Sequence, residues 1–123
     1  MPFDSANYGS EEMQLLLRGR HRIENGWVQG KLVAERGDGV LHFCMLGSIQ
    51  CADDGTQVNS PAITKALRLL TDVIRKLCNT KVVLANRTIP NYNDAPGRTK
   101  DEVLHVFDTA IKMQIVDDLH RVV

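Results

Sequence analysis

Cys44 is the residue of this 123-residue chain that comes closest, by type and spacing, to a catalytic group. His42 stands two positions before it, and His105 is a second potential base further along the chain. A cysteine nucleophile needs a thiolate and a nearby base. The adjacent Phe43 and Met45 instead predict an apolar environment, which raises the pKa of a thiol and makes it inert. A buried structural cysteine is therefore the preferred interpretation, and a small enzyme that uses Cys44 is the alternative.

Residues that could bind a metal are present, but their spacing is poor. His42, Cys44 and Cys51 lack the close pairs of a tetrahedral zinc site. The run from Asp53 to Gly55 lacks the alternating ligands and the final glutamate of a calcium loop. No metal and no cofactor is predicted. With Cys78, the cysteines form an odd set without paired spacing, which is typical of reduced thiols in a cytoplasmic protein.

The most specific stretch of the chain is a turn that leads directly into a helix, at residues 93–102 (Asn-Asp-Ala-Pro-Gly-Arg-Thr-Lys-Asp-Glu). Pro96 presets its backbone angle and Gly97 supplies a positive φ, which together favour a type II turn. Thr99 stands three positions before Glu102, the spacing of a capping box. The sequence therefore predicts a helix that starts after Thr99.

That turn could also frame a binding site for a small anionic ligand, because exposed N–H groups at a helix start attract anions. The candidate ligand-binding residues are Trp27, Gln29, Asn93, Asp94 and Arg98. Acidic side chains already occupy the first turn of the helix and disfavour a second anion there. The competing interpretation is a structural loop, in which Asp94 pairs with Arg98 or accepts turn amides.

Basic residues gather in two places. Arg18, Arg20 and Arg22 lie close together but fan around a helix axis, which indicates a solvated face. The stretch from 60 to 100 contains eight basic residues against Asp72 and Asp94, and could form a face that meets an acidic protein or a phosphate: Lys65, Arg68, Arg75, Lys76, Lys81, Arg87, Arg98 and Lys100. The whole chain is neutral, with 15 basic and 15 acidic residues, and only Tyr92 offers a stacking ring in the basic stretch. Nucleic-acid binding is therefore not the preferred interpretation, and a nucleic-acid-binding regulator is a further alternative.

These groups must be positioned by a mainly helical framework. Ser10 and Ser60 with Pro61 predict two capped helices, which end at Asn25 and near Asn79. A β-hairpin is expected near residues 30–43, a short buried helix within residues 44–52, and a short strand or added helical turn at residues 82–84. The predicted fold class is mainly α, a compact helical single domain over residues 1–123 with a short β-hairpin; an α+β fold is the alternative.

The last helix has an apolar pattern that changes side. Val103, Val106 and Phe107 share one face, whereas Gln114 and Asp117 fall on that face further along. The candidate interface residues are the apolar ones that project from the other side: Ile115, Val116, Leu119 and Val122. Either the helix bends near Met113, or a straight helix has two apolar faces. The absence of Gly and Pro from residues 100–123 favours a straight helix, and with it a homodimer or a protein partner.

Three blocks of sequence carry a resemblance to a known family: Trp27 to Gly30, Cys44 to Ile49, and Asn93 to Thr99 with Glu102, Val103, Ala110 and Ile111. In these blocks the chain resembles a small family of uncharacterised proteins from bacteria, notably actinobacteria, and their phages. Tyr92 stands where that family usually has Trp. The resemblance implies a small helical fold and no known activity.

Together these observations predict a small cytoplasmic, non-enzymatic binding or accessory protein that self-associates, with a phage origin as one possibility. The N-terminal ten residues show no basic region followed by an apolar run, so no signal peptide is expected. The apolar run at residues 40–49 is far shorter than a membrane span, and no membrane partner is expected.

Overall fold

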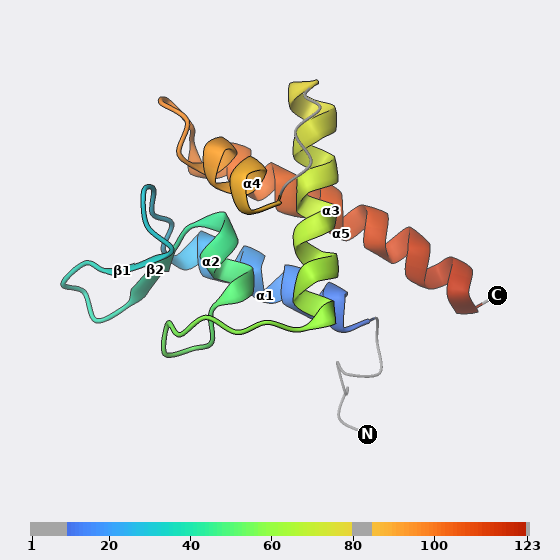
Figure 1. Ribbon diagram of the computed structural model, residues 1–123, viewed down its shortest axis with the longest axis horizontal. Helices are drawn as coiled ribbons and strands as arrows, with labels where there is room; N and C mark the ends of the chain where they lie inside the picture. Colours follow the sequence, from blue (N-terminus) through green and yellow to red (C-terminus); the bar gives the residue numbers. More distant parts are fainter. Residues whose placement is uncertain (1–9, 80–84, 123) are drawn as a thin grey trace.

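The capping residues of the sequence set where the helices of the computed structural model begin (Figure 1). The structure describes residues 10–79 and 85–122. Helix α1 (Glu11–Asn25) starts after Ser10, whose Oγ accepts the N–H of Met13, and α3 (Pro61–Cys78) starts after Ser60 in the same way. Helix α3 ends at Asn79, which adopts the left-handed conformation typical of a helix end. Both predicted helices are confirmed.

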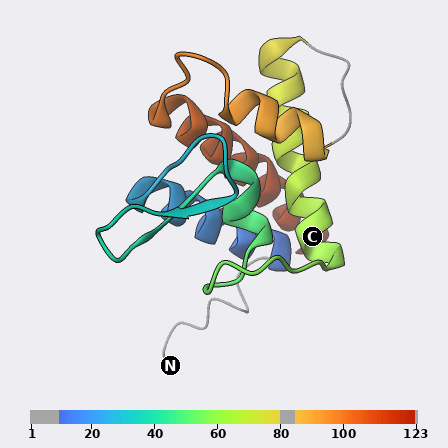
Figure 2. The ribbon, with the colours of Figure 1, turned by 60° about the vertical axis from the view of Figure 1, so that its left-hand side comes forward.

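A short antiparallel hairpin joins α1 to a one-and-a-half-turn helix. Strands β1 (Val33–Glu35) and β2 (Leu41–Phe43) pair with Val33 opposite Phe43, and α2 (Met45–Gln50) follows at once. The chain at 26–28 runs along the other edge of β2, because Val28 N–H donates to the Phe43 carbonyl. Figure 2, with the hairpin turned toward the viewer, shows it lying across α1 and α2. The hairpin and the short helix are both confirmed.

Helix α4 (Ala85–Asn93) was not expected, because it contains Pro90. A proline inside a helix removes one backbone hydrogen bond and usually ends the helix. Ile89 and Tyr92 are nevertheless buried against the core, mainly on α3, and this burial outweighs the lost bond. The strand or helical turn predicted at residues 82–84 lies outside the described residues.

The core lies between α1, α3, α4 and α5 (Lys100–Val122), with α2 packed into it. Its largest members include Leu16 of α1, Leu70 of α3 and Phe107 of α5. Gly19 allows α1 to approach α2 and α5 closely, since a Cβ there would stand 2.8 Å from Phe107 Cε1 and 2.7 Å from Ile49 Cδ1. Most of the described residues lie in these five helices, so the mainly α fold class with a short hairpin is confirmed.

Helix α5 continues without a break through Met113, and its C-terminal end extends past the other helices (Figure 1). The straight, two-faced helix is therefore the arrangement that forms, and the bend near Met113 does not occur. Gln114 lies on the core side as expected, with only 3% of its surface exposed. Asp117 was also expected on the core side, but it is exposed. The neighbouring Asp118 is the acidic residue that contacts the start of α1, at Ser10.

Candidate functional site

Four of the five predicted ligand-binding residues meet in one hydrogen-bond network around Asn93. Asn93 ends α4 and is fully buried, and its Oδ1 accepts both the Trp27 indole N–H at 2.7 Å and the Met45 backbone N–H at 3.0 Å. Its Nδ2 donates to the Val28 carbonyl and to Asp94. One amide side chain thus joins α4 to the segment after α1 and to the start of α2.

Gln29 and Asp94 extend this network along its exposed edge. Gln29 Nε2 donates to the backbone carbonyls of Asn93 and Ala95, at 2.9 and 3.3 Å. Asp94 Oδ1 accepts the N–H of Gly30 at 2.9 Å. The polar groups that could have met a ligand are thus engaged with one another and with backbone. This geometry supports the structural-loop interpretation of the stretch.

Arg98, the fifth candidate, contacts Tyr92 and Glu102 instead. Its guanidinium lies 3.6 Å above the centre of the Tyr92 ring, its Nε donates to the Tyr92 carbonyl at 2.8 Å, and its NH1 pairs with Glu102. The expected pairing of Asp94 with Arg98 is therefore wrong, and Glu102 takes the role of Asp94. Sequence reasoning did not predict the Tyr92–Arg98 stack, since a separation of six residues matches no regular element.

The predicted turn and cap are both present before α5. Arg98 N–H donates to the Ala95 carbonyl at 3.0 Å across Pro96 and Gly97, and Gly97 has a φ of 77°. Glu102 Oε1 accepts the Thr99 N–H at 2.9 Å, while Thr99 Oγ1 accepts the Glu102 N–H at 3.1 Å. Hydrogen bonding from Thr99 and the charge of Arg98 lower the pKa of Glu102. The capping box is confirmed.

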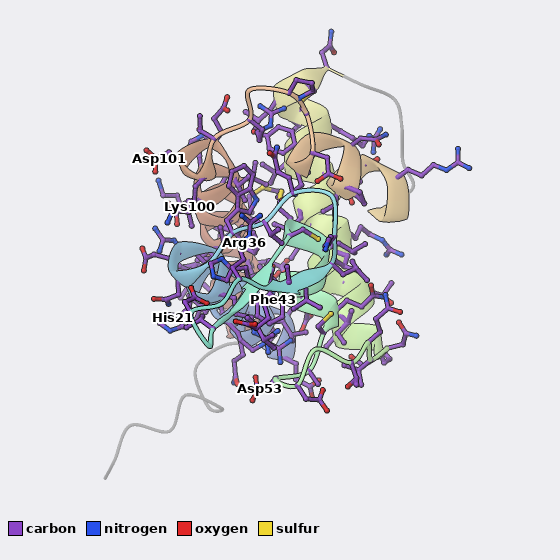
Figure 3. All side chains as sticks on the ribbon, turned by 90° about the vertical axis from the view of Figure 1, so that its left-hand side faces the viewer. His21, Arg36, Phe43, Asp53, Lys100 and Asp101 are labelled. Atoms are coloured by element: carbon purple, nitrogen blue, oxygen red, sulfur yellow. The ribbon has the colours of Figure 1, made fainter. Side chains whose placement is uncertain are left out.

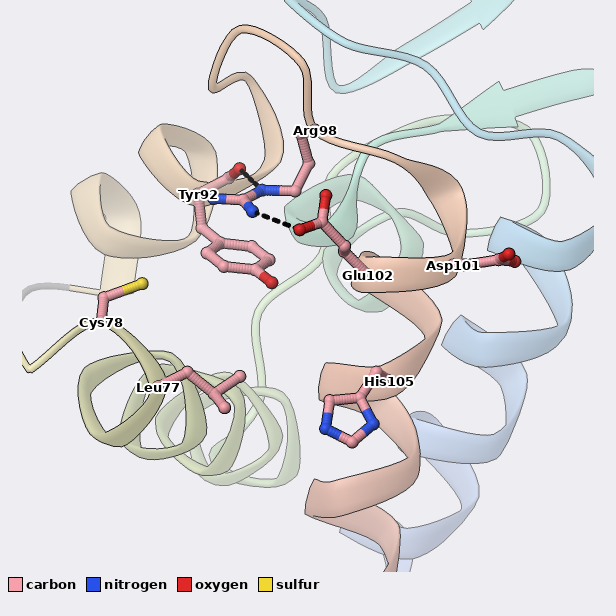
Figure 4. A pocket seen from close by; sticks show the side chains of 7 residues that line it. All are labelled: Leu77, Cys78, Tyr92, Arg98, Asp101, Glu102 and His105. Carbon is pink, nitrogen blue, oxygen red and sulfur yellow. Dashed lines mark hydrogen bonds and ion pairs between the residues drawn. The ribbon is translucent and has the colours of Figure 1, made fainter.

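A pocket of about 450 Å³ lies beside this cap, between the end of α3 and the start of α5. Leu77 and Cys78 form its apolar side, and His105 and Glu102 stand on α5 opposite them. Figure 4 shows the Tyr92 hydroxyl pointing into the space between Leu77 and His105. Leu77 is half exposed here.

Cys44 is buried, with 5% of its surface exposed, and caps α2 by accepting the Gly47 N–H on its Sγ at 3.3 Å. Burial raises the pKa of this thiol. Among the described residues, no hydrogen bond joins Cys44 Sγ to either predicted base: His42 Nε2 lies 2.9 Å from Asp38 Oδ2, and His105 lines the pocket beside Cys78. This environment favours a structural thiol over a nucleophile. Within residues 10–79 and 85–122, no group of His, Cys, Asp and Glu side chains is placed to hold a metal ion.

The arginines of α1 fan around the helix as expected, but they do not simply face solvent. Each of them bonds to another segment of the chain. Arg18 donates to the Ile49 carbonyl, Arg20 pairs with Asp108 of α5, and Arg22 pairs with Asp53. Arg22 also lies 4.5 Å above the Phe43 ring. Figure 3 shows Phe43 and Asp53 on the face that carries the hairpin.

The exposed apolar residues at the end of α5 form a second candidate surface. Ile115, Val116 and Leu119 are 45%, 52% and 60% exposed. Val122 belongs to the same helix, and its side chain lies outside the described set. Leu17 of α1 is also exposed, at 49%.

Two polar contacts between α1 and α5, here called clamps, together with helix geometry indicate that Leu17 and Ile115 lie on the same edge of the molecule. Arg20 of α1 pairs with Asp108 of α5, and Ser10 at the start of α1 bonds to Asp118. The two helices are therefore antiparallel. Leu17 lies between the two clamp residues of α1, and Ile115 follows Asp108 by seven residues, which is about two turns and the same side. We call Leu17, Ile115, Val116 and Leu119 the apolar edge.

The fold and these surfaces define a small helical protein with a packed polar network and one exposed apolar edge. Among the described residues, no helix is both long and apolar enough to cross a membrane. The chain belongs to a family of unknown function, DUF6197, whose model matches residues 9–113. No curated protein and no solved structure matches the chain.

Proposed function

We propose that this protein is a small cytoplasmic accessory protein that works as a homodimer, and that the apolar edge is its dimer interface. The observation that carries the proposal is the exposure of three adjacent apolar side chains on a continuous α5. Single exposed apolar residues are common, but a contiguous group of them usually marks an interface. The network around Asn93 serves in this view to fix the fold, and Trp27, Gln29, Asn93, Asp94 and Arg98 remain candidates for a small anionic ligand only as a second possibility.

A second copy of the chain is the partner that the edge fits best. A two-fold axis brings identical surfaces together, and closed symmetric dimers are the commonest oligomers. The chain has no net charge, so two copies approach without net repulsion. The edge also runs across the α1–α5 seam, and two such edges can pack as four helices.

Replacing Ile115 and Leu119 with Glu should give a folded monomer, because charge is costly at a buried contact and harmless on a surface. Light scattering at tens of micromolar should report a dimer for the unmodified protein and a monomer for the double variant. Both side chains are about half exposed in the monomer, so its circular dichroism should not change. Leu17→Glu should weaken the dimer as well.

The matched control is Val40→Glu with Val58→Glu. These valines are 44% and 45% exposed and lie outside α1 and α5. Their replacement with Glu adds the same charge as the interface variant. This control should remain a dimer. A monomeric unmodified protein would overturn the proposal, and so would a control variant that dissociates as readily as the interface variant.

A further inference from the structure

The outer face of α3 forms a basic groove with the second half of α5. One hollow of about 160 Å³ is lined by Lys65 and Arg68, together with Gln114 of α5. A second hollow of about 340 Å³ is lined by Arg75 and Lys76, together with Met113. The two hollows share Asp72, and we call them together the α3 groove.

The cations of the α3 groove are only partly neutralised. Lys65 lies 3.6 Å from Glu12, and Arg75 lies 3.8 Å from Asp72, at the outer limit of an ion pair. Among the residues that the structure describes, Arg68 and Lys76 have no ion pair or hydrogen bond, and the Nε of Arg75 is buried without a partner. The groove therefore has four positive charges, against two negative ones, and free donors.

Two other basic residues of the stretch from 60 to 100, Arg98 and Lys100, do not add to this surface. Arg98 is engaged with Tyr92 and Glu102, and Lys100 donates to the Glu24 carbonyl of α1. Figure 3 shows Lys100 next to the acidic Asp101, on the face that carries the hairpin. Four basic residues of this stretch therefore lie together on α3.

The spacing and lining of the groove select the kind of ligand. Lys65 and Lys76 are eleven residues apart, or about 16 Å along the helix, which is too long for one phosphate and suits an extended chain of about five residues. The described lining contains no aromatic side chain on which a base could stack. It does contain Leu69 and Met113, which can receive aliphatic side chains.

We propose that the α3 groove binds an extended acidic peptide segment of a partner protein. The carboxylates of the peptide pair with Arg68 and Lys76. An aliphatic side chain of the peptide, located between these carboxylates, packs on Met113. On α5, Ile115 projects about 200° and Leu119 about 240° from Met113, whereas Val116 projects only about 60° from it. The centre of the apolar edge, at Ile115 and Leu119, therefore faces away from the groove, and a homodimer centred on these two residues leaves the groove open.

The test is the fluorescence anisotropy of a labelled peptide that alternates Glu with Leu, titrated with the full chain. Binding should weaken steeply with added salt, because the contacts are ionic. Arg68→Glu with Lys76→Glu should weaken binding by about tenfold or more, since two attractive contacts become repulsive. The matched control is Lys31→Glu with Arg36→Glu in the hairpin region, where Arg36 is labelled in Figure 3; both are exposed, and the variant has the same net charge.

The control should bind the peptide as the unmodified protein does, and so should the monomeric Ile115→Glu, Leu119→Glu variant. Equal losses of peptide affinity in the groove variant and the hairpin control would overturn the groove as the binding site. They would indicate that the peptide is attracted by the overall charge of the protein. A single-stranded oligonucleotide that binds more tightly than the peptide would overturn the ligand class. Failure of the peptide to bind the unmodified chain at low salt would overturn the proposal outright and leave the dimer unaffected.

Discussion

At the scale of single residues, the Asn93 side chain joins three segments that are far apart in the sequence. It is fully buried, and it satisfies the Trp27 indole, the Met45 amide and the Val28 carbonyl. Buried polar groups cost free energy when they lose their partners, so these three groups depend on one side chain. The network therefore stabilises the junction of α1, α2 and α4.

Asn93→Ala should lower the free energy of unfolding by on the order of 3 kcal/mol, because it leaves buried donors and an acceptor unpaired. Asn91→Ala is the control, since Asn91 is exposed on the same helix and should change stability little. Urea unfolding followed by circular dichroism measures both. Equal stability of the two variants would show that the network contributes nothing.

The cysteines should divide by burial when the native protein meets a thiol reagent. Cys78 is exposed and should react quickly, whereas Cys44 and Cys51 are buried and should react only after unfolding. Burial also raises the pKa of both buried thiols, which lowers their thiolate fraction near neutral pH. Mass spectrometry of the modified chain identifies the site. Rapid native labelling of Cys44 would restore the enzyme hypothesis.

A serine in the buried position of Cys44 would find a hydrogen-bond partner in the structure. The Gly47 N–H that now bonds to the sulfur would bond to the hydroxyl of Cys44→Ser. Serine is a favoured N-cap, so this substitution should cost less than expected from burial alone.

At the scale of elements, the start of α5 is held by a capping box whose strength depends on pH. Thr99→Ala should cost about 1 kcal/mol through the lost cap. Gly97→Ala should also destabilise the protein, because a Cβ is strained at a φ of 77°. Thermal melts of both variants measure these effects, and two unchanged midpoints would remove the turn-and-cap model.

The pKa of Glu102 is lower in the folded state than in the unfolded state, so its contribution has a definite sign. The stabilisation by the ionised Glu102 carboxylate is fully present above the pKa of the unfolded state. This stabilisation is lost as the pH falls through the lower pKa of the folded state. Glu102→Gln should therefore be less stable than the unmodified protein near neutral pH. The difference should shrink below about pH 4, where the unmodified carboxyl also becomes protonated.

At the scale of the whole molecule, dimerisation through the apolar edge should make stability depend on concentration. A partner that binds only the folded state stabilises it by mass action. The thermal midpoint of the unmodified protein should rise with protein concentration, and that of the Ile115→Glu, Leu119→Glu variant should not. The pI of the sequence is about 6.9, so the solubility of the protein should be lowest near neutral pH, where the net charge repulsion between molecules vanishes.

The amino-acid sequence by itself determined the features that depend on neighbouring residues. The caps at Ser10, Ser60 and Thr99, the turn at Gly97 and the straight α5 were all predicted, because each follows from side chains within about one helical turn. Even the second apolar side of α5 could be read from periodicity. Five candidate ligand residues were also named, and four of them do meet in space.

The tertiary structure decided everything that depends on which surfaces meet. Helix α4 forms despite Pro90 because Ile89 and Tyr92 gain burial against the core, and that gain is invisible in the local pattern. Whether a polar group is free or engaged also depends on distant partners: Asn93 lies 66 positions from Trp27, and their hydrogen bond turns a candidate ligand site into a packed junction. Leu17 is exposed for the same reason, since the place of α5 beside α1 sets which side of α1 stays in water.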